Sequence, residues 1–263
     1  MTTKHRPRAV LALTVALVVL LATQAGAGAA TGTTAAIGKS QREAVVLVTT
    51  LSANNPSALE QGFYDLVESG AILAAAATLG PRYNTVTIVK DAAATRSGLV
   101  SALRTAASHS GTKAVDLFIS THGLDNQLVF AEGTRSITSV RNAILVGLTS
   151  VQRAKLRIVY STACIGQSHL TGWIQAGFAA ASGSKGIYTD SAFSHPAFLA
   201  SWALFGRTFG QSVSAANGAD VFHVSDGAAA LYFTSQGAAD KAKLVNSTRV
   251  SAGNTGLKID SAP

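Results

Sequence analysis

Two residues in this sequence have side chains that could act together as a nucleophile and an acid/base. Cys164 ends the segment LRIVYSTAC (156–164), and His122 ends the segment AVDLFISTH (114–122). Each follows a run of apolar and β-branched residues, and each is followed closely by a glycine. A free thiol is only a few per cent thiolate at neutral pH, so a nearby imidazole would raise its nucleophilicity. The pair therefore predicts covalent catalysis on the sulfur.

Cys164 is the only cysteine of the chain, and a buried free cysteine is often just a small core residue. Its position argues against that role, because the apolar run before it ends at Tyr160. The residues that follow include Ser161, Thr162 and Gly166, which are typical of a turn. A single cysteine cannot form a disulfide within the chain. We expect a catalytic thiol, with a structural one as the alternative.

The backbone around this pair could stabilise a developing negative charge. Gly123 has no side chain, so its N–H could approach an oxyanion, with the N–H of Cys164 as the second donor. A helix predicted to begin near His169 would present its positive end to the sulfur. His169 could itself cap this helix or modulate the thiol, although a structural or solvent-exposed histidine is the default expectation.

Strand and helix patterns alternate along the chain. Continuous apolar and β-branched runs predict strands at 43–51, 85–90, 114–121, 156–162 and 185–190. Helical patterns lie between or after them, within 54–80 and at 94–111, 136–148, 169–181 and 195–217. A loop and a short hairpin are expected directly after His122, and a further strand is expected at 230–236. The alternation predicts an α/β fold with a mostly parallel sheet and helices on both faces.

In such a sheet the loops at the carboxyl ends of the strands converge, and ligands bind there. His122 and Cys164 both follow strands at this end. If the strands at 114–121 and 156–162 are neighbours, their ends lie about 5 Å apart. The imidazole and the thiol could then act on one substrate.

The first residues have the pattern of a secretory signal peptide. A basic start precedes an apolar run at 9–22, which is shorter than the roughly 20 residues needed to span a bilayer. We expect residues 1–29 to be removed and the protein to be secreted. Beyond them we predict a flexible leader at 30–42, a catalytic domain at 43–236 and an irregular, loose C-terminal tail at 237–263.

Composition and motifs exclude several classes of function. The chain has 21 Lys and Arg against 13 Asp and Glu, and without the signal peptide its net charge is about +5. The basic residues are scattered, so we expect no nucleic-acid partner, and after signal cleavage no membrane contact. The sequence has no clustered Cys/His set, no H-E-x-x-H, no G-x-S-x-G and no phosphate-binding glycine loop. We therefore expect no metal, no cofactor and no serine nucleophile.

The two motifs together resemble those of the caspase-like (clan CD) cysteine peptidases, the group that includes caspases, legumains, clostripain and gingipains. LFISTHG (117–123) and IVYSTACIG (158–166) carry the resemblance, and His122 precedes Cys164 by 42 residues. In layout the chain is most similar to gingipain- and clostripain-type relatives, over about residues 43–217. The resemblance implies a three-layer αβα sandwich, a Cys164 nucleophile, and His122 as the acid/base that protonates the leaving amine.

The resemblance also implies an oxyanion hole formed by the N–H groups of Gly123 and Cys164, and a peptide or protein substrate. In several of these families the residue two before the cysteine helps to form the S1 pocket through a carboxylate or an amide. Here that residue is Thr162. Asp190 and Asp226 are other acids that could accept a basic P1 side chain, and the alternative for each is a solvated loop carboxylate.

The function that follows is a secreted cysteine endopeptidase. Two alternatives stay open. One is a non-catalytic secreted domain of the same fold that binds a peptide or protein, and the other is a legumain-like transpeptidase that uses the same acyl-thioester.

Overall fold

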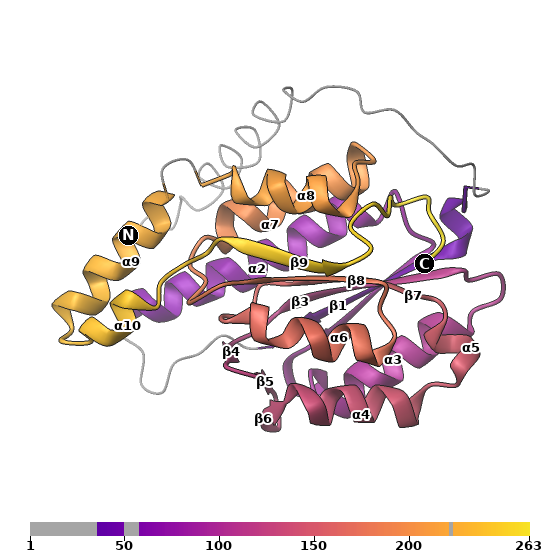
Figure 1. Ribbon diagram of the computed structural model, residues 1–263, viewed down its shortest axis with the longest axis horizontal. Helices are drawn as coiled ribbons and strands as arrows, with labels where there is room; N and C mark the ends of the chain where they lie inside the picture. Colours follow the sequence, from indigo (N-terminus) through magenta and orange to yellow (C-terminus); the bar gives the residue numbers. More distant parts are fainter. Residues whose placement is uncertain (1–35, 50–57, 221–222) are drawn as a thin grey trace, which may run out of the picture.

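The computed structural model describes residues 36–49, 58–220 and 223–263 (Figure 1). The predicted signal peptide, residues 1–29, lies outside these ranges, as does the predicted leader up to residue 35. The rest of the leader is packed, because Ile37 is buried and its N–H donates to the carbonyl of Asp260 at 2.8 Å.

A six-stranded sheet forms the centre of the fold, in the order β2-β1-β3-β7-β8-β9. Its strands are β1 (Arg42–Val48), β2 (Thr85–Lys90), β3 (Ala114–Ser120), β7 (Leu156–Ser161), β8 (Ala180–Ser184) and β9 (Arg249–Gly253). The first five run parallel, and β9 pairs antiparallel with β8 at one edge. Every residue of β1, β3 and β7 is buried, which accounts for their continuous apolar sequence.

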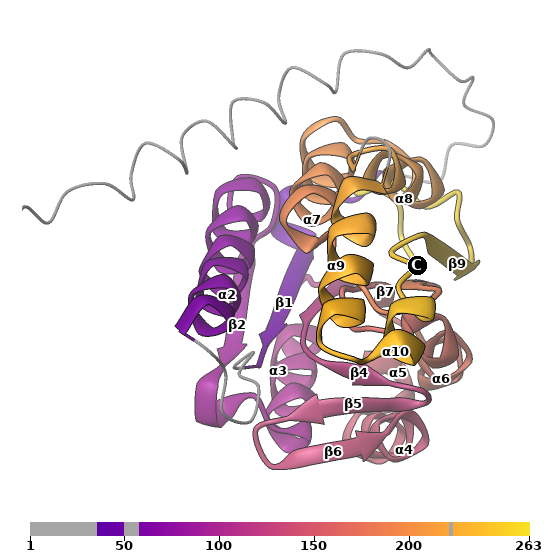
Figure 2. The same ribbon diagram turned by 90° about the vertical axis from the view of Figure 1, so that its left-hand side faces the viewer.

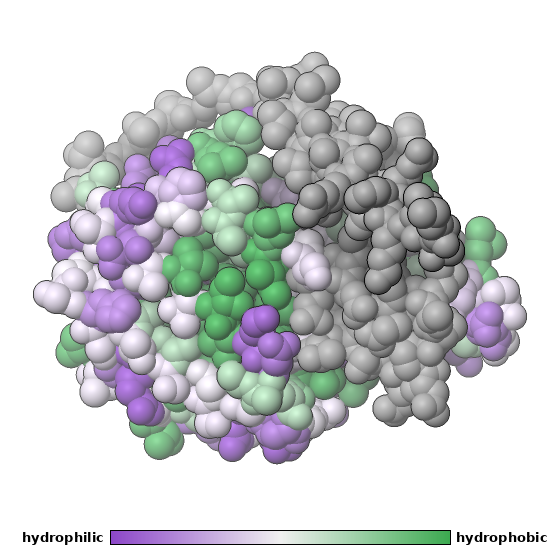
Figure 3. Space-filling model, turned by 180° about the vertical axis from the view of Figure 1, so that it is seen from behind, coloured by the Kyte–Doolittle hydropathy of each residue, from purple (hydrophilic) through white to green (hydrophobic). Residues whose placement is uncertain are grey.

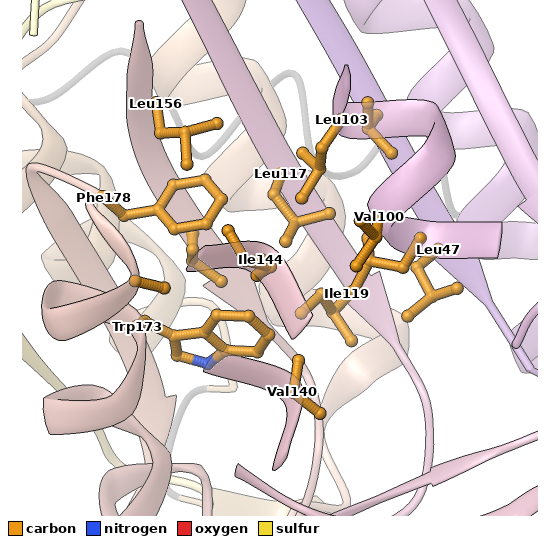
Figure 4. Close-up of a cluster of buried hydrophobic side chains, with 14 of the residues drawn as sticks. Leu47, Val100, Leu103, Leu117, Ile119, Val140, Ile144, Leu156, Trp173 and Phe178 are labelled. Carbon is orange, nitrogen blue, oxygen red and sulfur yellow. The ribbon is translucent and has the colours of Figure 1, made fainter. Parts of the chain in front are cut away.

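Helices cover both faces of this sheet, which gives three layers (Figure 1). One face carries α3 (Arg96–Ser108), α4 (Ile137–Gly147), α5 (Ser150–Arg153) and α6 (Leu170–Ala176). The other carries α2 (Ala58–Leu79), α7 (Ser191–Leu199) and α8 (Phe209–Asn217). Each face has its own apolar core, and Figure 4 shows the first, in which Trp173 and Phe178 lie near Leu117 and Leu156. The predicted αβα sandwich is confirmed.

A small antiparallel sheet follows β3 and leaves the main sheet at the end where His122 lies. It consists of β4 (Gly123–Leu124), β5 (Gln127–Phe130) and β6 (Gly133–Ser136). Figure 2 shows it at the same end of the molecule as α9 (Val224–Ser235) and α10 (Ala239–Lys243). The predicted loop and hairpin after His122 are therefore present.

The edge strand β2 lies on the face shown in Figure 3, where apolar side chains gather near the centre. Ile88 of β2 and Leu73 of α2 are among the exposed large hydrophobic residues of the described chain. Lys90 at the end of β2 is also exposed and pairs with Asp91 at 3.4 Å. A charge at the end of an edge strand opposes pairing with another sheet.

Three sequence expectations are wrong. Residues 230–235 belong to helix α9, and residue 236 caps its end, so no strand lies there. The strand expected at 185–190 lies instead at β8, whose sequence AASGS has no β-branched residue. The tail at 237–263 is not loose throughout, because it contains α10 and β9, and both Leu257 and Ile259 are buried. The other proposed domain boundaries stay predictions.

A buried ion pair explains why the tail is held. Arg157 of β7 donates to both carboxylate oxygens of Asp116 in β3, at 2.8 and 2.7 Å, and both side chains are fully buried. The Tyr83 hydroxyl also donates to Asp116. The remaining guanidinium nitrogen of Arg157 donates to the carbonyls of Ile259 and, at 2.7 Å, Ser261. The C-terminal segment therefore supplies hydrogen-bond acceptors that a buried guanidinium needs.

Candidate active site

The strands that carry His122 and Cys164 are neighbours. β3 pairs in parallel with β7, with Ile119 opposite Ser161, and the Thr162 N–H donates to the carbonyl of Ile119 at 2.8 Å. Both chains therefore leave the sheet at the same end. The expectation that His122 and Cys164 act on one substrate required their strands to be neighbours, and they are.

The two turns touch through Gly123. A Cβ atom on Gly123 would overlap the carbonyl oxygen of Cys164, and it would lie 2.9 Å from the Cβ of Ala163 and 3.1 Å from the N of Cys164. A side chain at this position has no room, because most of what it would meet is backbone. The absence of a side chain at residue 123 lets the turn after His122 lie directly against the turn that holds the sulfur.

Backbone N–H groups point at the sulfur of Cys164. The thiol is half-buried and accepts a hydrogen bond from the N–H of Tyr188 at 3.4 Å. Burial raises the pKa of Cys164, while the N–H groups of Tyr188, Gly123 and Cys164 itself act to lower it. These donors favour negative charge on the sulfur.

His122 is also half-buried, and burial lowers its pKa below the ordinary 6.5. Hydrogen bonds at His122 and at the residue before it hold the backbone here. Its carbonyl accepts from the Val129 N–H at 3.0 Å, and the hydroxyl of the preceding Thr121 bonds to Thr49 at 2.6 Å and to the carbonyl of Val129 at 2.5 Å. The raised pKa of the thiol and the lowered pKa of the imidazole both favour the uncharged forms of the two groups near pH 7.

The predicted helix after Cys164 is shorter than expected. A 3₁₀ turn, Gly166–His169, precedes α6, which has seven residues. The N–H groups that lower the pKa of Cys164 belong to Gly123, Tyr188 and Cys164. Individual turns, and not the end of a long helix, supply the polar groups around the sulfur.

Thr162 uses its hydroxyl within the sheet. Its Oγ1 donates to the carbonyl of Ile119 at 3.1 Å, and the side chain is 8% exposed. Its assignment as a substrate-binding residue stays a prediction, and its hydroxyl already has a partner within the sheet.

Asp190 is buried at the start of α7, where it accepts from the Ser194 N–H at 3.2 Å. Burial raises the pKa of Asp190 to about 6; the bonds from Ser194 and the charge of Arg249 oppose this rise, and Asp220 adds to it. Asp226 is also occupied, because it accepts from the Thr189 hydroxyl at 2.8 Å and from the Ser247 N–H at 2.9 Å. Neither acid is the solvated loop carboxylate considered as the alternative.

Sequence reasoning missed Tyr188 and Arg249. Arg249, on β9, donates to the carbonyl of Ser161 just before the Cys164 turn. Its guanidinium lies 4.0 Å from the ring centroid of Tyr160 and 5.0 Å from that of Tyr188. Tyr188 contributes through its backbone N–H, which every residue type except proline has. No residue pattern could have identified either of them.

Among the described residues, no three His, Cys, Asp or Glu side chains lie close enough together to hold a metal ion. Across the same residues, no helix combines the length and apolar character needed to cross a membrane.

Replacing Gly123 by Ala is expected to disable the site while the sheet survives. The added methyl group must push the backbone of Cys164 away, at a cost of about 1–3 kcal/mol. Any turnover at the Cys164 sulfur should fall on the order of 100-fold, because the hydrogen-bond donors around the sulfur are displaced. Gly227→Ala in α9 is the matched control, because its Cβ would meet nothing within 4 Å. Equal turnover by both variants would show that the contact has no functional role.

Comparison with known proteins bears on the fold. No protein-family model matches the sequence, and no curated protein does. Caspase-1 from Spodoptera frugiperda overlays with a TM-score of 0.55 at 10% identity, over 87% of this chain and 93% of the caspase. The Arg-specific cysteine proteinase gingipain R gives a TM-score of 0.48 at 11% identity over 84% of this chain, which spans 48% of that protein. The overlay with the caspase confirms a caspase-like fold.

Proposed function

We propose that this protein is a secreted cysteine endopeptidase that cleaves peptide bonds through an acyl-thioester on Cys164, with His122 as acid/base. One observation carries the proposal: the residue after His122 packs directly on the backbone of Cys164, and three backbone N–H groups favour negative charge at the sulfur. A cysteine that only fills space needs no such donors. The caspase-like fold supports the same reaction class.

The first chemical step transfers the thiol proton of Cys164 to His122 as the sulfur attacks the substrate carbonyl carbon. A C–S bond forms, and the carbonyl π electrons move to oxygen. We assign the N–H groups of Gly123 and Cys164 to the stabilisation of that oxygen, since both belong to the turns that lie beside the sulfur. His122 then gives its proton to the amide nitrogen, and the C–N bond breaks to release the amine.

The second step returns the enzyme to its resting state. Water attacks the thioester, His122 accepts a proton from it, and the C–S bond breaks to regenerate the thiol and release a carboxylic acid. An amine in place of water would give a new peptide bond. Product analysis by mass spectrometry, with a nucleophilic amine present, separates hydrolysis from transpeptidation.

The pH dependence tests the roles of the two residues. The alkylation rate of the resting thiol should rise with pH to above 9.0, because burial raises the pKa of Cys164 above that ordinary value. Peptide hydrolysis should rise earlier, through a midpoint below 6.5, because His122 must be unprotonated to accept the thiol proton and burial lowers its pKa. Iodoacetamide kinetics and the pH profile of kcat/KM measure these two limbs separately.

His122→Ala should lower kcat/KM by about 100- to 10,000-fold and remove the lower limb. His109→Ala is the control, because that histidine caps the C-terminus of α3, before the strand β3 begins, and its side chain lies 3.3 Å from Glu43. If alkylation and hydrolysis instead share one limb below pH 7, the resting pair is an ion pair and the proton transfer described above is wrong. If the wild-type protein neither hydrolyses peptides nor acylates Cys164, the non-catalytic binding domain is the correct alternative.

A further inference from the structure

We propose that His169 and Ser168 are positioning residues: together they hold the turn containing Cys164 against the hairpin that follows His122. This proposal rests on the proposed peptidase function, since it concerns the geometry of the same site. The two residues form what we call the clamp. Each bonds across from the Cys164 turn to the β4–β5 hairpin, whose first residue is Gly123.

His169 makes the first of these bonds. Its side chain is fully buried, and its Nε2 lies 2.9 Å from the carbonyl oxygen of Leu124. A carbonyl can only accept, so Nε2 carries the proton and donates. Leu124 is the residue directly after Gly123, so this bond fixes the N–H of Gly123 through a single peptide unit.

Ser168 makes the second bond, and its hydroxyl also bonds within the Cys164 turn. Its hydroxyl accepts from the N–H of Asn126 at 2.8 Å and donates to the carbonyl of Ile165 at 2.8 Å. The Ser168 N–H donates to the same carbonyl at 3.0 Å. Ile165 directly follows Cys164, so one hydroxyl links the hairpin to the residue next to the sulfur.

The backbone of Ile165 shows why the turn needs to be held. Its φ of 53° and ψ of 29° are left-handed, a conformation that β-branched residues rarely adopt and that costs about 1–3 kcal/mol. The Ile165 N–H donates to the carbonyl of Gly186 at 2.7 Å, and a side chain on Gly166 would meet the backbone of β8. The turn is therefore fixed to β8 on one side and to the hairpin, by the clamp, on the other.

Loss of the clamp would let the Cys164 turn and the Gly123 turn move apart. The sulfur would lose the N–H of Gly123, and the oxyanion would lose one of its two donors. The expected signs are a higher thiol pKa, because one group that lowers it is gone, and slower chemistry at unchanged substrate binding.

The experiment compares three variants of the full chain. His169→Leu removes the donor at similar volume, His169→Gln keeps an N–H near the Nε2 position, and Ser168→Ala removes the linking hydroxyl. Ser212→Ala is the matched control, because Ser212 is a buried serine in α8 whose hydroxyl donates to the carbonyl of Thr208, the residue before that helix, at 2.9 Å. Each protein is measured for its melting temperature, the pH dependence of iodoacetamide alkylation, and kcat and KM on a peptide.

We expect His169→Leu and Ser168→Ala to lower kcat by about 10- to 100-fold with KM nearly unchanged, and to move the alkylation limb to higher pH. His169→Gln should recover most of kcat, and Ser212→Ala should match the wild type. The clamp is refuted if His169→Leu and His169→Gln lower kcat equally, or if folded His169→Leu has a wild-type thiol titration. If His169→Leu does not fold, Ser168→Ala decides by the same two measurements.

These outcomes are separable from failure of the proposed function. If His169→Leu and Ser168→Ala hydrolyse peptides as fast as the wild type does, the clamp is overturned and the peptidase proposal stands. A wild-type protein that cleaves nothing, but whose thiol titration moves in both clamp variants, would overturn the peptidase and leave the clamp.

Discussion

Cys164→Ala is expected to abolish peptide hydrolysis and to leave the fold intact. The variant lacks the atom that forms the thioester, and loss of a nucleophile lowers kcat by roughly 10⁴- to 10⁶-fold in enzymes of this mechanism. The thiol is half-buried, so its removal should cost less than about 1 kcal/mol. The measurement is cleavage of a peptide library, read by mass spectrometry, with melting temperature as the check on folding.

Cys164→Ser is the matched control for shape. It keeps an atom at the same position, but a hydroxyl is a much weaker nucleophile than a thiol, so hydrolysis should stay near the level of the Ala variant. Because the chain has one cysteine, a peptidyl electrophile should add one label per molecule to the wild type and none to either variant. Hydrolysis that persists in a pure Cys164→Ala preparation would show that Cys164 is not the nucleophile.

The second large effect concerns stability. Asp116→Ala is expected to lower the free energy of unfolding by about 3–5 kcal/mol, because it leaves the fully buried guanidinium of Arg157 without its carboxylate. Tyr83 loses the acceptor of its hydroxyl at the same time. Chemical denaturation followed by circular dichroism measures the change.

Asp240→Ala is the comparison for an exposed ion pair. Asp240 and Lys243 lie 3.1 Å apart with exposed side chains, so breaking their contact should not change stability measurably. Asp116→Asn keeps the volume and removes the charge, and it should fall between Asp116→Ala and the wild type. A loss below about 1 kcal/mol for Asp116→Ala would mean that Arg157 finds other partners, and the account of the buried pair would then be wrong.

That His122 and Cys164 leave the sheet at the same edge could be predicted because parallel sheets impose a strong rule, whereas the adjacency of their strands was only a condition. Two buried strands in one parallel sheet send their carboxyl ends to the same edge, whatever lies between them in sequence. Runs such as those before His122 and Cys164 show a buried strand by composition alone. The structure adds the register of β3 with β7 and the contact of Gly123 with Cys164, which depend on packing and not on pattern.

β8 could not be predicted from composition, for a physical reason. A Cβ on its Gly183 would overlap the backbone of Gly166, two residues after Cys164. The close approach of the turn requires small residues in the strand, and small residues carry little strand signal. The feature that hides β8 in the sequence is the one that places it beside the Cys164 turn.

The contributions of Tyr188 and Arg249 were unpredictable because they are non-local. Tyr188 acts through a backbone N–H. Arg249 reaches the carbonyl of Ser161 across 88 positions of sequence, from a segment whose polar composition predicts disorder. A polar segment can still be ordered when its few apolar residues, here Leu257 and Ile259, are buried and its backbone satisfies a buried charge.

The position of β9 and the segment after it also determines when the molecule can become complete during synthesis. The hydrogen bond from Arg157 to the carbonyl of Ile259 can form only after a further 102 residues have been made. The bond from Arg249 to the Ser161 carbonyl likewise needs a residue that is translated much later. Translation runs from the N-terminus, so β1, β3 and β7 leave the ribosome well before their last partners do. Such long-range closure is slow. A nascent chain released only up to β8 would hold both His122 and Cys164 but would lack these two contacts to β7, so the complete candidate site would form late in folding.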